Sequence, residues 1–463
     1  MMVKFRIEKD SLGTIKVENS KLWGAQTQRS IKNFNIGVGK FHFQQIFIEA
    51  LALQKKSCAL ANSDFNLLTK KHSSTISKVC DLIINQKLND HFPLVVWQTG
   101  SGTQINMNLN EVIANKCNLL LGKKLPTNSP LHPNDDINKS QSSNDTIPTA
   151  MHIATVLALH RELLPSISKI KKSLKKKVQE FKGIIKIGRT HTQDATPIKL
   201  SSEFQAFYDQ VSYAEKNIKN SLNKLYYLAQ GGTAVGSGVN APKTFDKKFI
   251  KHLNKITKLP FKSANNKFEA LASHDVFIEV MSGIEILVSS VFKMANDIRV
   301  LASGPRSGIA ELILPTNEPG SSIMPGKINP TQCEALSMIC AHILGLKNSI
   351  TFACTQGHFQ LNVYNPIIIH NTLDAIRLIS EGINSFNKNC LIGIRANKKR
   401  IKELLNNSLM LVTPLTKIIG YDLASKVALN AYNKNISLKE SCLELTDLSE
   451  SEFDKYTNPK NMV

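Results

Sequence analysis

Apolar residues recur at intervals of three and four along most of the chain, which is the pattern of amphipathic helices. The earliest runs are short, whereas three runs in the middle of the chain are long. A helix of about 35 residues would be about 50 Å long, which is typical of an extended helical bundle. The predicted helices of this part of the chain cover residues 43–61, 73–84, 106–121, 145–183, 200–229 and 266–303.

The helical pattern continues to the C-terminus, over residues 331–351 and 365–394 and then through a small helical unit with a capping-box spacing from Ser449 to Glu452. Strand-like segments are few, so the predicted fold is mostly α. Helices this long present wide apolar stripes, and we expect the chain to associate with copies of itself. The expected domains are a mixed, mostly helical N-terminal domain over 1–141, a central long-helix bundle over 142–362 and a small C-terminal helical domain over 363–463.

Charge and cysteine usage narrow the class of protein. The 463 residues carry a formal net charge of +22, which fits nucleic acid, a membrane surface or an anionic substrate as partner. The densest lysine run, at 169–177, alternates with apolar residues at helical spacing, which favours a solvated helix face over a phosphate-binding surface. The eight cysteines form no C-x-x-C pair, which argues against zinc, iron–sulfur and disulfide frameworks. With no signal-peptide pattern and no continuous apolar span, we expect a cytoplasmic protein without membrane contact.

Residues 320–330 combine a flexible backbone with polar side chains that could bind or react with a ligand. Pro325 lacks a backbone donor and two glycines loosen the chain, so neither helix nor strand is expected. The stretch nevertheless carries a serine pair, an amine and an amide. We expect Asn329 to cap the helix that follows, with Pro330 at its first position. A flexible loop that ends at a helix N-terminus suits binding of a small anion.

Three other breaks between predicted helices share this polar character. They cover residues 99–104, 132–145 and 188–197, and each is rich in Ser, Thr, Asn or His. Together with 320–330 they offer many donors for carboxylate oxygens and one histidine beside a threonine. The chain has neither a Walker loop nor a G-x-G-x-x-G after a strand, so no cofactor fingerprint is present.

The amino-acid sequences of these stretches resemble those of a known family. GSSIMPGKINPTQCEAL is similar to the loop signature of the fumarase/aspartase superfamily, and TGSGTQINMNLNEV, HPNDDINKSQSSND and GRTHTQDATP match in the same order. Within the superfamily these motifs resemble class II fumarases, over nearly the whole chain. The resemblance implies a three-domain, mostly helical fold whose long central helices form a twenty-helix core in a homotetramer. It also implies active sites shared between three subunits, with neither a metal nor a cofactor.

The resemblance further implies an activity, the reversible hydration of fumarate to (S)-malate, and a role for each matching residue. Ser321 would remove the C3 proton of malate, and Lys327 would help to stabilise its alkoxide. His191 would act as the other acid/base residue, through a water on the C2 hydroxyl, with Glu334 as its charge partner. The residues implied to bind substrate are Ser101, Gly102, Thr103, Ser142, Ser143, Asn144, Thr190, Ser322, Lys327 and Asn329.

A secondary anion site is also implied, at His132, Pro133, Asn134 and Asp135. Some relatives carry a basic residue three positions before this histidine, where this chain has Ser129. Without other evidence, His132 is more typical of a capping or surface histidine.

Three other functions remain open at this point. An aspartate ammonia-lyase belongs to the same superfamily, although Gly326, Thr331, Gln332 and Cys333 favour fumarase. A basic helical protein could instead bind nucleic acid through its lysine-rich faces, and would then lose RNA binding at high salt. A structural relative without activity is the third alternative, but every residue expected for the chemistry is present.

Overall fold

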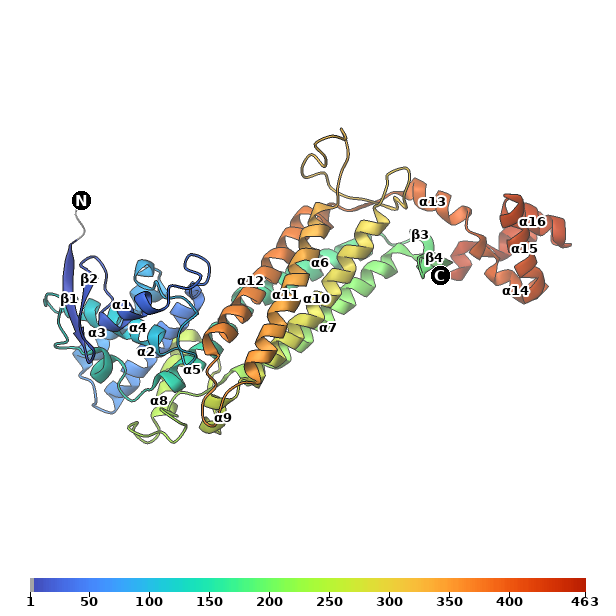
Figure 1. The fold of residues 1–463 in the computed structure, drawn as a ribbon. Coiled ribbons are helices and arrows are strands. Elements are labelled where there is room, and N and C mark those ends of the chain that lie inside the picture. The colour runs from blue at the N-terminus through green and yellow to red at the C-terminus, as the bar shows by residue number, and fades with distance from the viewer. Residues whose placement is uncertain (1–3) are drawn as a thin grey trace. The chain divides into compact units, whose positions relative to one another are not determined.

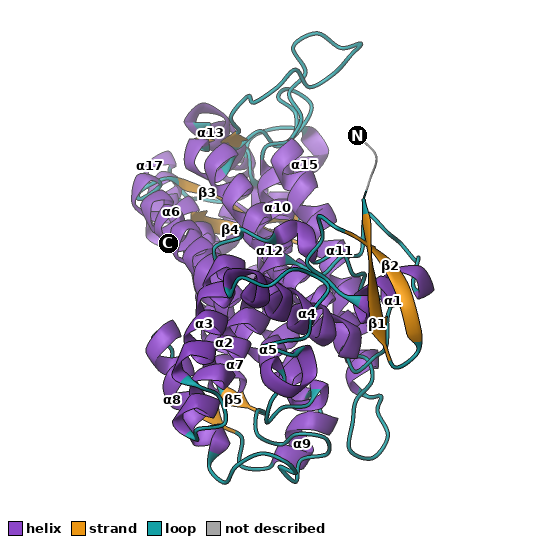
Figure 2. Ribbon diagram, turned by 90° about the vertical axis from the view of Figure 1, so that its left-hand side faces the viewer, coloured by secondary structure: helices purple, strands orange, loops and turns teal. Residues whose placement is uncertain are grey.

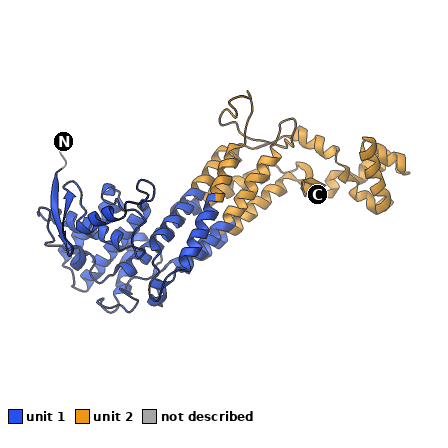
Figure 3. Ribbon diagram, in the orientation of Figure 1, with its two compact units in different colours: residues 1–165, 216–286, 342–379 blue, residues 166–215, 287–341, 380–463 orange. Residues whose placement is uncertain are grey.

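The computed structural model describes residues 4–463, and most of them are helical (Figures 1 and 2). The chain divides into two compact units (Figure 3). Unit 1 takes the chain up to Pro165 together with Lys216–Ile286 and His342–Ile379, and unit 2 takes Ser166–Glu215, Leu287–Ala341 and Ser380–Val463. The described strands form four two-stranded sheets. The expected domain boundaries at residues 141 and 362 stay a prediction.

Unit 1 is built around α2, which packs against α3, α5 and α8. Its core is apolar, with Phe47, Leu51 and Ile76 almost completely buried. Its elements are β1 (Phe5–Asp10), β2 (Gly13–Glu18), α1 (Ala25–Asn33), α2 (Gln45–Asp64), α3 (Lys70–Ile84), α4 (Thr103–Leu120), α5 (Ser143–Ala158), β5 (Tyr227–Leu228), α8 (Phe245–Thr257), β6 (Lys262–Ser263) and α9 (Lys267–Ala272), with short turns at Asn89–His91, Pro133–Ile137 and Leu159–Leu163.

Five long helices contribute residues to both units. They are α6 (Leu164–Glu180), α7 (Leu200–Leu225), α10 (Asp275–Leu301), α11 (Thr331–Cys354) and α12 (Asn365–Asn389). Unit 2 adds β3 (Ile185–Thr190), β4 (Gln193–Lys199), β7 (Leu312–Ile313), β8 (Arg395–Ala396), α13 (Lys398–Asn406), α14 (Thr416–Ile419), α15 (Tyr421–Lys434), α16 (Leu438–Leu445) and α17 (Glu450–Tyr456), with 3-10 turns at Leu391–Gly393, Leu409–Leu415 and Pro459–Met462.

The predicted long helices are confirmed, with two changes. The run over 145–183 forms α5, a π-helical turn and α6 as successive helical segments. The run over 266–303 is broken at Ser273–His274 into α9 and α10, because Ser273 adopts an extended conformation. The predicted break between helices at 188–197 is confirmed, and its residues belong to the antiparallel β3–β4 hairpin, which the sequence pattern did not indicate. The capping box from Ser449 to Glu452 is confirmed.

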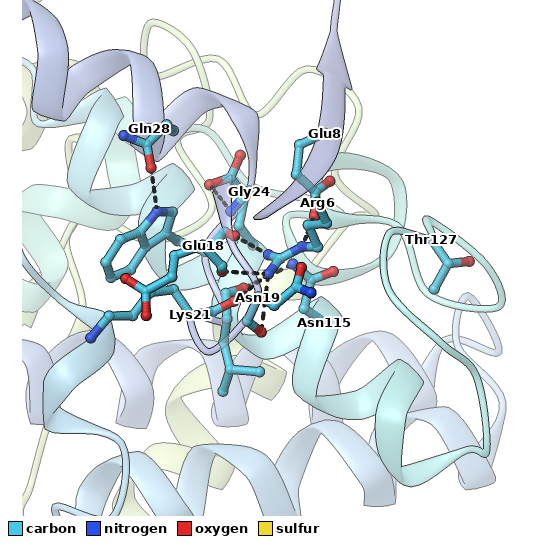
Figure 4. Close-up of polar contacts among 12 residues, drawn as sticks. Arg6, Glu8, Glu18, Asn19, Lys21, Gly24, Gln28, Asn115 and Thr127 are labelled. Atoms are coloured by element: carbon cyan, nitrogen blue, oxygen red, sulfur yellow. Dashed lines mark hydrogen bonds and ion pairs between the residues drawn. The ribbon is translucent and has the colours of Figure 1, made fainter. Parts of the chain in front are cut away.

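The segment before α1 is fixed by buried charges (Figure 4). The Arg6 guanidinium donates to the backbone carbonyls of Glu18, Lys21 and Trp23 at 2.9, 2.7 and 2.7 Å. Glu111 of α4 accepts hydrogen bonds from the backbone N–H groups of Gly24, Gln26 and Thr27. These contacts satisfy backbone groups that the loop would otherwise leave unpaired, so this polar stretch acts as packed structure.

Helix α11 is long and apolar enough to cross a membrane by length and composition, and it is the one helix of residues 4–463 that meets this test. Glu334, His342 and Lys347 interrupt its apolar residues, so it is not the continuous apolar span that was sought in the sequence. Only 22% of its most apolar window is buried within the chain. An exposed apolar surface of this length is typical of an interaction site.

Two buried histidines of unit 1 predict a pH-dependent stability. His152 and His274 both pack edge-on against Phe277, and burial lowers the pKa of each to about 4. A histidine whose pKa is lowered in the fold binds fewer protons there than when unfolded, so its contribution is present above pH ~6.5 and is lost as the pH falls to about 4.

We expect each histidine to cost about 3 kcal/mol of unfolding free energy over this range. His274→Leu should remove one such contribution, so that this variant loses less stability than the wild type between pH ~7 and ~4. Urea unfolding at both pH values measures the difference. His358→Leu, at an exposed histidine, is the control and should keep the wild-type slope. An unchanged slope in His274→Leu would contradict the prediction.

Candidate active site

Three hydroxyl side chains meet where two helices of unit 1 begin. Thr103 Oγ1 lies 2.9 Å from Ser101 Oγ and 2.9 Å from Ser143 Oγ. Thr103 is the first residue of α4 and Ser143 is the first residue of α5. Helix N-termini present unpaired backbone donors and the positive end of the helix dipole, so this hydroxyl cluster is suited to an anionic group.

Gly102 is required for this arrangement. Its φ of 73° lies in the left-handed region, and a Cβ at this position would lie 3.0 Å from the Ile147 side chain. A glycine therefore allows both the tight turn into α4 and the close approach to α5.

The turn that leads into α5 is held from two sides. Ser142 caps the helix and forms a capping box with Asp145, so α5 begins at Ser143, slightly before the predicted start at residue 145. The Asn144 side chain donates to the Ala234 carbonyl at 2.8 Å. The Asp145 carboxylate also accepts from the backbone N–H groups of Gly231 and Thr233, at 2.9 and 3.0 Å. The polar turn is thus tied to the glycine-rich loop that follows α7 and β5.

In unit 2, the 320–330 stretch forms an irregular loop before α11, as predicted. Ser321 Oγ accepts hydrogen bonds from the backbone N–H groups of Ile323 and Met324, at 3.3 and 3.0 Å. The Ile323 side chain is 82% exposed, so the loop is uncovered in the single chain. Two N–H groups directed at one hydroxyl oxygen favour negative charge on that oxygen.

The predicted cap at Asn329 is wrong. Helix α11 begins at Thr331, and the backbone N–H groups of Cys333 and Glu334 bond to the Pro330 carbonyl. The Asn329 amide instead donates to the Gly320 carbonyl and closes the loop across its base. A Cβ at Gly320 would lie 2.1 Å from the Lys327 carbonyl oxygen, so this closure requires glycine.

His191 lies at the exposed tip of the β3–β4 hairpin, where Thr190 pairs with Gln193. His191 and Thr192 have φ values of 56° and 61°. A two-residue hairpin turn with both φ values positive normally carries Asn and Gly. Residues other than glycine in this conformation cost about 1 kcal/mol or more each, and such strain persists where the surrounding structure fixes it.

The described residues contain no group of three or more His, Cys, Asp or Glu arranged to hold a metal ion. Two family models match the chain, and the first of them spans both the hairpin and the 320–330 loop. The model described as "Lyase" covers residues 13–345, and the model described as "Fumarase C C-terminus" covers residues 411–463.

Individual relatives match the chain over nearly its whole length. Fumarate hydratase class II 2 of Bradyrhizobium diazoefficiens is 51% identical over 458 residues, which is 99% of this chain and 96% of that protein. Fumarate hydratase class II of Rickettsia conorii is 51% identical over 462 residues, which is 100% of this chain and 99% of that protein. The chain belongs to the class II fumarase family.

The fold of this class II fumarase family member agrees with a solved relative. The crystal structure of the class II fumarase from Schistosoma mansoni has a TM-score of 0.97 and 39% identity, and each chain covers 99% of the other. The predicted membership and the mostly helical fold of the superfamily are therefore confirmed.

The family's motif residues fall in both units. Unit 1 carries Ser101 to Thr103 and Ser142 to Asn144, and unit 2 carries Thr190, His191 and Ser321 to Glu334. Within the part of the chain that the structure describes, no hydrogen bond or ion pair joins His191 to Glu334 or Ser321. The Lys327 and Glu334 side chains are exposed. The hydroxyl cluster belongs to unit 1 and the loop to unit 2.

The expected secondary anion site has a mainly local hydrogen-bond pattern. His132 Nδ1 accepts the backbone N–H groups of Asn134 and Asp135 at 3.3 and 3.2 Å, in the manner of a helix cap. Pro133 begins the short helical turn that follows. A polar cavity of about 200 Å³ is lined by all but Asp135 of this set, together with Asn128 and Glu111. The capping interpretation of His132 is confirmed, and the anion site stays a prediction.

Sequence reasoning missed a polar layer behind the hydroxyl cluster. Lys55 of α2 is 1% exposed, and its Nζ lies 2.9 Å from the side-chain oxygens of both Asn138 and Gln141. Burial lowers the pKa of Lys55 to about 8. Burial also raises the pKa of the Asp145 carboxyl to about 6, although its backbone donors favour the ionised form. The available signal was the polar triplet Gln54-Lys55-Lys56 inside a largely apolar helical run.

Proposed function

We propose that this protein catalyses the reversible hydration of fumarate to (S)-malate, the hydro-lyase reaction of the tricarboxylic acid cycle. The observation that carries the proposal is the full-length identity of about half to proteins named fumarate hydratase class II. All residues expected for the chemistry are present, and the loop and hydroxyl cluster present donors suited to carboxylates. A cytoplasmic location is part of the proposal.

In the dehydration direction, Ser321 removes the C3 proton of malate. A serine hydroxyl is a weak base, so its alkoxide needs stabilisation. The N–H groups of Ile323 and Met324 already point at Ser321 Oγ, and the Lys327 ammonium belongs to the same loop. Fixed donors at the atom where charge develops are the most effective form of such stabilisation.

Loss of the C3 proton leaves a dianionic aci-carboxylate, in which negative charge spreads onto the carboxylate oxygens. Lys327 and Asn329 would bind one carboxylate from the loop, with Ser322 beside them. Thr103, Ser143 and Asn144 would bind from the hydroxyl cluster, supported by Ser101, Gly102 and Ser142. Because these donors are held by helix N-termini and backbone contacts, they lower the barrier without reorganising during the reaction.

His191, with Thr190 beside it, would supply the second proton transfer. Acting through a water, it protonates the C2 hydroxyl, which then leaves as water as the double bond forms. A carboxylate partner raises the basicity of an imidazole, so Glu334 suits a group that must be protonated in one direction and neutral in the other. The reaction as proposed uses only side-chain acid/base chemistry, with neither a metal nor a cofactor.

We propose that the active site is completed in a homotetramer, with stretches from three subunits in each site. The separation of His191 from Glu334 in the hydrogen bonding of one chain supports this assembly. So do the exposed apolar side chains on the long helices: Phe292, Val300, Met338, Leu344 and Phe352. Their helices α10 and α11 would meet those of the other copies in a twenty-helix core.

A charge on this apolar surface should therefore break the assembly. Met338 of α11 is 68% exposed in the single chain, and Met338→Glu would bury a carboxylate at every equivalent contact. We expect light scattering after size exclusion to show a tetramer for the wild type and smaller species for Met338→Glu. Leu429→Glu, at a 58% exposed residue of α15, is the matched control and should stay tetrameric. A tetrameric Met338→Glu would contradict the proposed core.

The proposed activity is tested with purified protein and two substrates. Malate and aspartate are supplied separately, and the appearance of fumarate is followed by its ultraviolet absorbance. The proposal requires turnover of malate. Turnover of aspartate without malate would instead identify an ammonia-lyase.

A further inference from the structure

Four charged side chains form one group at the hairpin that carries His191, and two of them, Lys186 and Glu311, are completely or almost completely buried. The Glu311 carboxylate is completely buried and accepts both Arg189 Nη1 and Nη2 at 3.1 Å. Lys186 Nζ lies 3.1 Å from the same carboxylate and 2.9 Å from Glu203 Oε1. The two cations and two carboxylates balance, so the group is neutral overall.

An irregularity in the hairpin allows both Lys186 and Arg189 to contact the Glu311 carboxylate. In a regular strand Lys186 and Arg189 would face opposite sides, because successive side chains alternate. The register between β3 and β4 shifts between Ile187 and Arg189, and such an irregularity redirects the following side chain. A Cβ at Gly188 would lie 2.7 Å from the Thr196 carbonyl oxygen, so glycine is needed where the shift occurs.

Glu311 is itself fixed by the backbone around it. Its N–H donates to the Leu301 carbonyl at the end of α10, and its carbonyl accepts the Asn397 N–H, both at 2.8 Å. The Asn397 side chain also donates to the Ala310 carbonyl at 3.0 Å. Ile187 packs into the apolar core of Leu405, Leu411 and Leu415, on the other side of the hairpin. The base of the hairpin is therefore held on both faces.

A contribution to folding stability does not by itself explain why these four charged side chains are placed together. Buried ion pairs often contribute no more than apolar side chains of the same size, because their desolvation offsets their attraction. A bidentate guanidinium–carboxylate pair does, however, fix direction as well as distance. Arg189 stands directly before Thr190 and His191, whose turn is held in a conformation that the chain disfavours.

We propose that Glu311, Arg189 and Lys186 are positioning residues for His191. They set the direction of the last residues of β3 and thereby hold the imidazole at the tip in its working orientation. Glu311 also begins the segment that runs on through β7 to Ser321, so its carboxylate orients the hairpin while its backbone anchors the start of the segment that leads to the proposed base. This inference rests on the proposed function for its kinetic consequences, although the positioning itself is a structural property.

The test combines two kinetic comparisons with one structural comparison. We expect Glu311→Gln to lower kcat for malate about 10- to 100-fold while KM changes less than about threefold, because a misplaced proton-transfer group affects turnover more than binding. In a His191→Asn background the same substitution should cost less than about twofold more, since its effect acts through His191. Glu311→Asp should recover part of the loss. Crystal structures should show the imidazole displaced by about 1 Å or more in Glu311→Gln.

Arg189→Lys is the second variant, and it keeps the charge but loses the bidentate contact. If Glu311→Gln does not fold, Arg189→Lys should show the same loss of kcat, the same dependence on His191 and the same displaced imidazole. The matched control is Lys177→Met, which removes another buried cation of unit 2, bonded to Glu180 and to the Ile394 carbonyl at 2.7 and 2.8 Å. It should lose stability without any coupling to His191.

Equal losses of kcat in the wild-type and His191→Asn backgrounds, or an unmoved imidazole, would overturn the positioning role. A wild-type protein that leaves malate unchanged would instead overturn the proposed function, and the crystal comparison would still decide the positioning role.

Discussion

Replacing Ser321 by alanine should lower kcat for malate dehydration by about 1,000-fold or more. The substitution removes the group proposed to take the C3 proton, and a positioned base typically contributes about 10²- to 10⁴-fold. The loop also loses the oxygen to which the Ile323 and Met324 N–H groups are directed. Those donors would then face solvent or the substrate, without a charge to stabilise.

The fold should be unaffected by this change. Ser321 lies in an exposed loop, and surface substitutions of this kind usually alter unfolding free energy by less than about 0.5 kcal/mol. Steady-state assays, together with thermal unfolding and size exclusion, measure both effects. Ser74→Ala, an exposed serine of α3, is the matched control and should retain wild-type kcat. Full activity in Ser321→Ala would show that the base is another group.

Replacing His191 by asparagine should lower kcat by about 100-fold, a smaller loss than that of Ser321→Ala. The second proton transfer would then depend on unassisted water, and general acid/base groups contribute at least about 10²-fold. Asparagine is the right substitute because it adopts the left-handed backbone more readily than most residues. The φ of 56° at position 191 can thus be kept while the imidazole is removed.

Thr192 provides the control for this variant. It has the same left-handed backbone, with a φ of 61°, but no assigned role in the chemistry. Thr192→Asn should keep kcat within about twofold and raise the thermal midpoint slightly, because a β-branched residue is strained there. If His191→Asn retained wild-type kcat, or if Thr192→Asn lost as much, turn geometry rather than the imidazole would account for the effect.

The features that depend on neighbouring residues, such as the long helices and the polar loops, could be predicted from the sequence. The apolar periodicity identified the long helices, since each buries one stripe along its length. The motifs identified the hydroxyl cluster and the loop, since glycine, proline and serine mark a backbone that leaves regular structure. The helix break at Ser273–His274 was missed because the polar triplet Ser273-His274-Asp275 also fits one exposed turn of a continuous helix.

Long-range contacts could not be read from the chain. The hairpin around His191 was predicted only as a break, because its short strands contain glycine, proline and charged residues that are uncommon in strands. Arg189 and Glu311 are 122 positions apart, and nothing near either residue indicates that they pair. Asn329 resembled a helix cap because of its position before Pro330, but its amide closes the loop onto Gly320 instead.

The most direct test of the proposed activity is proton NMR of fumarate incubated with the purified protein in D₂O that also contains ammonium. Hydration adds OD at C2 and one deuteron at C3, so we predict malate with a single C3 deuteron and no aspartate. The Ser321→Ala protein should leave fumarate unchanged over the same time. Formation of aspartate without malate, or unchanged fumarate with the wild-type protein, would contradict the proposed function.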